Sequence, residues 1–274
     1  MSDPYDFDGV QFLGDGYFAF IDYSVDPNRK PDSYASPWEL WVATLARART
    51  GDFSWVPKLL DLYLRSEDYV LKAQCADLLA DAAPTTTVAR IRESVAAKLI
   101  RGDRYDPQFA VDMSQVLFAN MRLSDVQLLL ATYQGGAQFE DTEIIISYLE
   151  YILGGIELKG GVGNLASDSE LVMRRVEQLA DRSGSDAVRL WQGEPFSVAG
   201  FAKNWLETSV PDPITMRRSF EATTGIDCRP FFENEEFQPL VAAATLEDFV
   251  ESPATAMYEV GVRYFFGHRI PDKV

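Results

Sequence analysis

The chain has 274 residues, of which 47% are apolar and 12% aromatic, so it can bury a large core as one extended unit or as two domains. Its 42 acidic and 25 basic residues give a net charge of −17. A surface this negative repels phosphate backbones and anionic lipids, which disfavours nucleic-acid and membrane partners. No stretch approaches the roughly 18 uncharged apolar residues that a membrane-spanning helix needs.

The N-terminal stretch carries acids and no base, so it lacks the basic start of a secretory leader, and we expect a cytoplasmic protein. Cys75 and Cys228 lie far apart in the sequence and are interpreted as reduced thiols. The excess acids are concentrated in residues 1–36, 140–157 and 225–260. Such a field attracts basic proteins; alternatively, the acidity only keeps the chain in solution.

Residues 1–36 are predicted to form an N-terminal arm. Within them, residues 5–25 alternate aromatic with polar residues and are interrupted by glycines, which favours an irregular segment or a short β-hairpin. Prolines then mark a linker. Ser36 is a suitable N-cap, Pro37 suits the first helical position, and Gly51 is a helix stop, so a helix is predicted between them.

An antiparallel helix pair is predicted over residues 54–65 and 69–83, because apolar residues recur there at helical spacing and the loop between them is very short. Four leucines should be buried between these helices: Leu59, Leu60, Leu78 and Leu79. The segment WVPKLLDLYLRSEDYVLKAQCADLLADAAP (55–84) resembles a HEAT-type repeat, which is an α-solenoid unit. Weaker units follow and should stack on it: 87–101 with 106–120, and 124–134 with 141–153. The helix over 106–120 is predicted to start with Asp106 as its cap and Pro107 after it.

The expected fold is therefore all-α, a HEAT-like α-solenoid of antiparallel helix pairs over residues 37–160. A glycine-rich stretch near residue 160 marks a boundary, and residues 161–274 should form a C-terminal helical region packed on the repeats. Helices are predicted there over 167–182 and 212–222, beside shorter aromatic-rich segments.

The sequence offers few residues for catalysis. His268 is the single histidine and lies six residues from the C-terminus, so histidine pairs for a metal are absent and a Ser-His-Asp arrangement has one candidate. Residues 160–163 lack the lysine of a phosphate-binding loop. Carboxylate pairs such as Glu235 with Glu236 could in principle serve glycoside hydrolysis, but such pairs are expected by chance in so acidic a chain. We therefore predict no catalytic residue, no cofactor and no metal, and hence no enzyme.

The C-terminal segment, 223–271, resembles the tail of a family of bacterial immunity proteins from polymorphic-toxin and contact-dependent-inhibition systems. The matching parts are Thr224-Gly225-x-Asp227-Cys228, Gln238-Pro239-Leu240 with the helix that follows, and Tyr264-Phe265-Phe266-Gly267-His268-Arg269-Ile270-Pro271. The resemblance implies a protein that binds and neutralises a cognate toxin domain. Seven of the aromatic residues in this segment are also expected to form one compact cluster: Phe231, Phe232, Phe237, Phe249, Tyr264, Phe265 and Phe266.

Charge and resemblance together favour an inhibitor of a basic toxin domain such as a nuclease, because nucleases are basic in order to hold phosphates. The alternative is an acidic helical-repeat scaffold or adaptor without a toxin partner. A catalytic repeat protein such as a DNA glycosylase would need a basic concave face, for which the bases are lacking.

A partner surface is predicted on the second helix of each pair, the one that lines the concave face of a solenoid. Its candidate residues are Asp77, Asp81, Asp112, Glu143 and Glu150. The alternative for them is a merely solvated face. A second candidate surface is the acidic C-terminal segment around Glu235, Glu236 and Glu247.

Overall fold

The computed structural model describes residues 13–20, 36–101, 106–207 and 213–274. Within these ranges the protein is mostly helical, as predicted, with eleven α-helices and three two-stranded antiparallel sheets. The helices are α1 Pro37–Ala48, α2 Lys58–Arg65, α3 Tyr69–Ala82, α4 Thr85–Arg101, α5 Pro107–Asn120, α6 Val126–Gly136, α7 Ile144–Leu153, α8 Leu165–Ser183, α9 Val198–Glu207, α10 Pro213–Thr224 and α11 Pro239–Glu251. The hairpin strands are β1 Leu190–Trp191, β2 Glu194–Pro195, β3 Phe232–Glu233, β4 Glu236–Phe237, β5 Tyr264–Phe265 and β6 His268–Arg269.

Local sequence signals explain where the helices begin. The Ser36 hydroxyl accepts a hydrogen bond from the backbone N–H of Glu39, and the Asp106 carboxylate accepts one from Phe109, so both predicted caps are confirmed. The first predicted helix of the HEAT-like pair starts later than expected, at Lys58, because residues 54–57 form turns. Helix α9 was not predicted.

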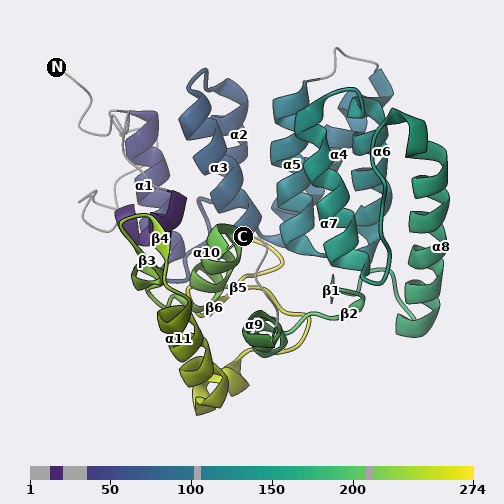
Figure 1. The fold of residues 1–274 in the computed structure, drawn as a ribbon. Helices are drawn as coiled ribbons and strands as arrows, with labels where there is room; N and C mark the ends of the chain where they lie inside the picture. Colours follow the sequence, from purple (N-terminus) through teal and green to yellow (C-terminus); the bar gives the residue numbers. More distant parts are fainter. Residues whose placement is uncertain (1–12, 21–35, 102–105, 208–212) are drawn as a thin grey trace.

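Helices α1 to α8 stand side by side across the upper part of the molecule, whereas α9 and α11 lie beneath them (Figure 1). Helix α3 contacts α2 and α5, and α7 contacts α5, α6 and α8. The four leucines predicted to be buried on α2 and α3 are all buried, and the two helices are in contact.

Two hydrophobic cores hold these layers together. The first runs through α1 to α8 and takes in residues on both sides of the predicted boundary near 160. The second joins α9, α10 and α11, where Phe220 meets Phe249 edge to face with ring centroids 5.0 Å apart. The aromatic residues of the C-terminal segment divide between the two cores, because Phe265 packs against Tyr17 in the first core while Phe231 lies in the second. The single terminal cluster predicted from the sequence is therefore wrong.

The N-terminal arm is not a β-hairpin over its described part. Residues Leu13–Phe20 form a 3-10 helix with a kink at Gly16, where φ is +57°. A Cβ on Gly16 would meet Glu221 Oε1 at 2.4 Å, so only glycine allows the arm to approach α10 this closely. The backbone N–H of Tyr17 donates to Glu221, which replaces the partner that a strand would supply. Residues 1–12 and 21–35, the rest of the predicted arm and linker, lie outside the described residues.

Candidate functional site

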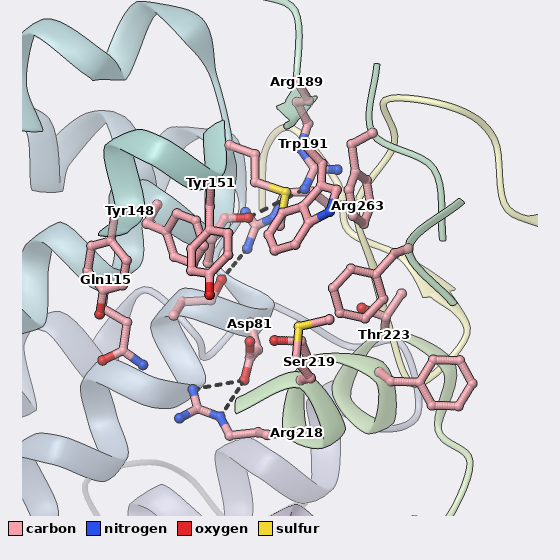
Figure 2. A pocket seen from close by; sticks show the side chains of 18 of the residues that line it. Asp81, Gln115, Tyr148, Tyr151, Arg189, Trp191, Arg218, Ser219, Thr223 and Arg263 are labelled. Carbon is pink, nitrogen blue, oxygen red and sulfur yellow. Dashed lines mark hydrogen bonds and ion pairs between the residues drawn. The ribbon is translucent and has the colours of Figure 1, made fainter. Parts of the chain in front are cut away.

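Two of the predicted partner-binding aspartates are held by an arginine. Arg218 on α10 forms ion pairs with Asp77 at 2.6 Å and with Asp81 at 3.1 Å, both on α3. Figure 2 shows the contact between Arg218 and Asp81. The Tyr17 hydroxyl donates to Asp81 at 2.6 Å, and Gln115 donates to Asp77 at 2.9 Å. Both carboxylates are thus engaged inside the molecule, so they do not form the open acidic stripe predicted for a partner.

The third predicted aspartate is buried. Asp112 on α5 is 5% exposed and accepts hydrogen bonds from the Tyr63 hydroxyl and the Gln108 amide, each at 2.7 Å. Burial raises the pKa of its carboxyl, and burial together with Asp112 raises the pKa of Tyr63. The prediction that Asp112 lies on a concave partner surface is wrong, because this polar residue joins α5 to α2 within the core.

The two candidate glutamates of the third predicted helix pair differ in exposure and in hydrogen bonding. Glu143 is exposed at the end of a 3-10 turn, Glu140–Glu143. Glu150 is half-buried on α7 and accepts a hydrogen bond from the backbone N–H of Leu158 at 2.6 Å. Glu150 therefore fixes the segment that follows α7, and it shares no continuous acidic stripe with Asp112.

The second candidate surface is open to solvent. Glu235 and Glu236 lie at the tip of the β3–β4 hairpin and Glu247 lies on α11, and all three side chains are exposed. Their neighbour Leu240, in the first turn of α11, is 84% exposed. We name as the acidic face the exposed acidic and large apolar residues of this hairpin and helix, which are Glu233, Glu235, Glu236, Leu240, Val241, Glu247, Asp248 and Glu251.

The acidic face is uncompensated by positive charge. Residues 230–262 contain seven acids and no lysine, arginine or histidine. Within the described part of the chain, none of the six acids of the acidic face forms an ion pair. On α11, Leu240, Glu247 and Glu251 are spaced i, i+7 and i+11, so a large apolar side chain shares one helix face with two carboxylates.

A pocket of about 480 Å³ lies where the two halves of the chain meet. Its walls come from α3, α5 and α7 on one side and from α9, α10, β1 and β5 on the other. Aromatic rings cover much of it, since Phe118 stacks on Tyr148 with centroids 4.4 Å apart and Tyr151 stacks on Trp191 at 5.2 Å. Figure 2 shows both tyrosines and Trp191 on the pocket wall, with Arg189 and Arg263 near Trp191.

Two of the arginines that line the pocket are held by carbonyl groups. Arg263 donates to the carbonyls of Ala80 and Ala83, each at 2.6 Å, at the C-terminal end of α3. Arg189 donates from Nε to the carbonyl of Asn120 at 2.9 Å. Burial lowers the pKa of both guanidinium groups. The positive charges of Arg263 and Arg122 lower the pKa of Arg189 further, whereas Asp81 opposes the effect of burial on Arg263, whose pKa falls to about 10.

The sequence reasoning missed this pocket. Arg189 stands between two apolar residues in an acidic chain, which is an unusual place for a charge, and Trp191 begins the tight turn at Gln192-Gly193. Those two signals were available, but nothing in the sequence reveals that α3, α5 and α7 contribute the opposite wall.

The structure also shows the environment of the two cysteines and the single histidine. Both cysteines are free and buried, as expected. His268 is exposed on β6, close to Gly51. Among the described residues, no three histidine, cysteine or acidic side chains are grouped to hold a metal ion. No helix in these ranges combines the length and apolar character needed to cross a membrane.

Comparison of the chain with protein-family models, with curated proteins and with solved structures finds no match. The resemblance of residues 223–271 to immunity proteins therefore depends on those residues alone.

Proposed function

We propose that this protein binds and neutralises a basic bacterial toxin domain, such as a nuclease, and that it does so through the acidic face. The observation that carries the proposal is the composition of that face, where six exposed acids, none in an ion pair among the described residues, share one hairpin and the helix after it with the exposed side chain of Leu240. An exposed leucine amid unpaired charges is typical of an interface that combines an apolar anchor with electrostatic attraction.

The electrostatics fit such a partner. A nuclease surface carries lysine and arginine side chains that bind phosphates. The segment over residues 230–262 has seven acidic residues and no basic residue, so its electrostatic potential is opposite to that of such a surface. Long-range attraction of this kind accelerates association, while Leu240 and Val241 lose water when the complex forms. The inhibitor acts by covering the toxin surface and needs no chemistry of its own.

We also propose that the helix pairs α2–α3, α4–α5 and α6–α7 are HEAT-like units. Support comes from the order of their contacts, in which α3 packs on α5 and α5 on α7, while α4 packs on α6. In this arrangement the repeats serve as a rigid support that presents the acidic face.

The decisive experiment begins with the genes beside that of this protein, one of which the proposal expects to encode the cognate toxin domain. Co-expression of the two should protect bacteria that the toxin domain alone kills, and titration calorimetry should show a complex whose affinity falls as salt is added. Absence of a complex, with metabolic genes as the neighbours, would favour the acidic scaffold or adaptor instead.

A further inference from the structure

The pocket differs in character from the acidic face. Its charged lining residues are Asp77, Asp81, Arg189, Arg218 and Arg263, which sum to a net charge of +1 from three arginines and two aspartates. Arg218 pairs with both aspartates, whereas Arg189 and Arg263 form no ion pair with any carboxylate among the described residues. The chain has a net charge of −17, so a positive, aromatic pocket suits a different ligand from the basic partner of the acidic face.

Arg189 has an unused hydrogen-bond donor. Arg189 is 7% exposed. Its Nε donates to the carbonyl of Asn120 and its Nη2 to that of Ala119, whereas its buried Nη1 has no hydrogen-bond partner. No carboxylate among the described residues pairs with it. The ring of Phe196 lies 4.8 Å from the guanidinium and contacts its face, which leaves the Nη1 donor unsatisfied.

A second unused donor lies two residues along. Trp191 Nε1 is buried and also lacks a partner. Arg189 pairs with Arg122 in an extended bridge and Trp191 belongs to β1, so residues 189 and 191 project from the same side of an extended segment. Both line the pocket, and buried donors without acceptors are rare in folded proteins.

We propose that this pocket binds a small planar aromatic molecule with one anionic group, which accepts hydrogen bonds from Arg189 and Trp191. A guanidinium recognises carboxylate and phosphate oxygens well, and the walls of Phe118, Tyr148 and Tyr151 suit a flat apolar body. The ligand carries only one such group, because Arg218, the arginine at another part of the lining, is already paired with Asp77 and Asp81. A volume of about 480 Å³ lies within the range of small-molecule sites.

The test uses two fluorescent probes of nearly the same shape. 1-Anilinonaphthalene-8-sulfonate carries one anionic group, and N-phenyl-1-naphthylamine lacks it. The anionic probe should bind with a stoichiometry of one and more tightly than the neutral probe. Displacement by 2-naphthoate and by 1-naphthyl phosphate then distinguishes a carboxylate from a phosphate as the natural anion.

Variants connect the binding to the two donors. Arg189→Gln should weaken the anionic probe by about tenfold or more and change the neutral probe little, since a hydrogen bond to a charged group is lost. Trp191→Phe keeps the ring stacking, removes one donor and should also weaken the anionic probe selectively. The matched control is Arg174→Gln, an exposed arginine on α8 paired with Glu170, which should change neither probe.

Several results would overturn the proposal. They are equal binding of the two probes, unchanged binding of the anionic probe in both Arg189→Gln and Trp191→Phe, and failure of both naphthyl competitors to displace it. If Arg189→Gln does not fold, as judged by circular dichroism, Trp191→Phe alone decides between the outcomes.

Discussion

Arg218 on α10 donates two hydrogen bonds to Oδ2 of Asp81 on α3, at 3.1 and 3.2 Å, and so joins two helices whose residues lie 137 positions apart in sequence. The Tyr17 hydroxyl donates to the same oxygen, so the N-terminal arm meets both helices there. This cluster holds the second half of the molecule against the first, and it explains why an aspartate predicted to face a partner faces its own chain.

Removing the arginine should destabilise the fold. Arg218→Met leaves Asp77 and Asp81 without their cation, so we expect a loss of about 1–3 kcal/mol in the free energy of unfolding, measured by urea titration. Arg174→Gln breaks an exposed ion pair and should cost well under about 1 kcal/mol. Equal effects of the two substitutions would show that the cluster does not stabilise the contact between α3 and α10.

The interface between α2 and α3 should be sensitive to lost volume. Leu79 is fully buried, so Leu79→Ala removes apolar contacts and leaves a cavity, and we expect a loss of about 2–5 kcal/mol in a denaturant titration. Leu64→Ala on α2 is the matched control, because that leucine is 51% exposed and should cost about 1 kcal/mol or less. A loss below about half a kcal/mol at Leu79 would mean that the two helices do not pack as described.

Stability should also depend on the titration of Glu221. Burial raises the pKa of this carboxyl from its ordinary value near 4.5 to about 7, although Arg217 beside it favours the charged form. Between these values the folded protein keeps a proton that the unfolded chain releases. The contribution of the protonated Glu221 to the free energy of unfolding is therefore fully present below pH 4.5 and is lost as the pH rises to about 7.

Glu221→Gln isolates this effect, because glutamine does not titrate. Its single side-chain oxygen can accept a hydrogen bond from the backbone N–H of Tyr17 or from that of Cys228, and the loss of the other bond lowers stability equally at every pH. The free energy of unfolding of the wild type, relative to the variant, should fall by about 3 kcal/mol between pH 4.5 and 7.5. Urea titrations across that range provide the measurement. A constant difference between the two proteins would contradict the raised pKa.

Sequence periodicity predicted the helices well where a strong cap coincided with an apolar repeat, as at Ser36 and Asp106. It failed where the deciding contacts come from distant parts of the chain. Asp112 looks like a solvated residue until Tyr63 is brought against it, and Gly16 looks like part of a strand until Glu221 takes up the neighbouring N–H group. The pocket was hidden for the same reason, since its two walls belong to segments that only the folded structure brings together.

The acidic face supplies the last prediction, which depends on the proposed function. Glu235→Lys combined with Glu236→Lys changes the net charge by four at the hairpin tip, and it should slow association with a basic toxin domain by about tenfold at low salt. Exposed charges contribute little to stability, so the melting temperature should stay nearly unchanged.

The matched control is Asp141→Lys combined with Glu143→Lys, because these exposed acids lie on the 3-10 turn before α7 and change the charge equally. Glu150 is unsuitable for such a test, since its carboxylate holds the Leu158 N–H and its reversal would disturb the fold. Stopped-flow measurements at two salt concentrations give the association rates. A loss confined to the hairpin variant supports the acidic face. An equal loss in both variants would instead indicate general attraction by the net charge, and a loss confined to the control would place the interface near α7.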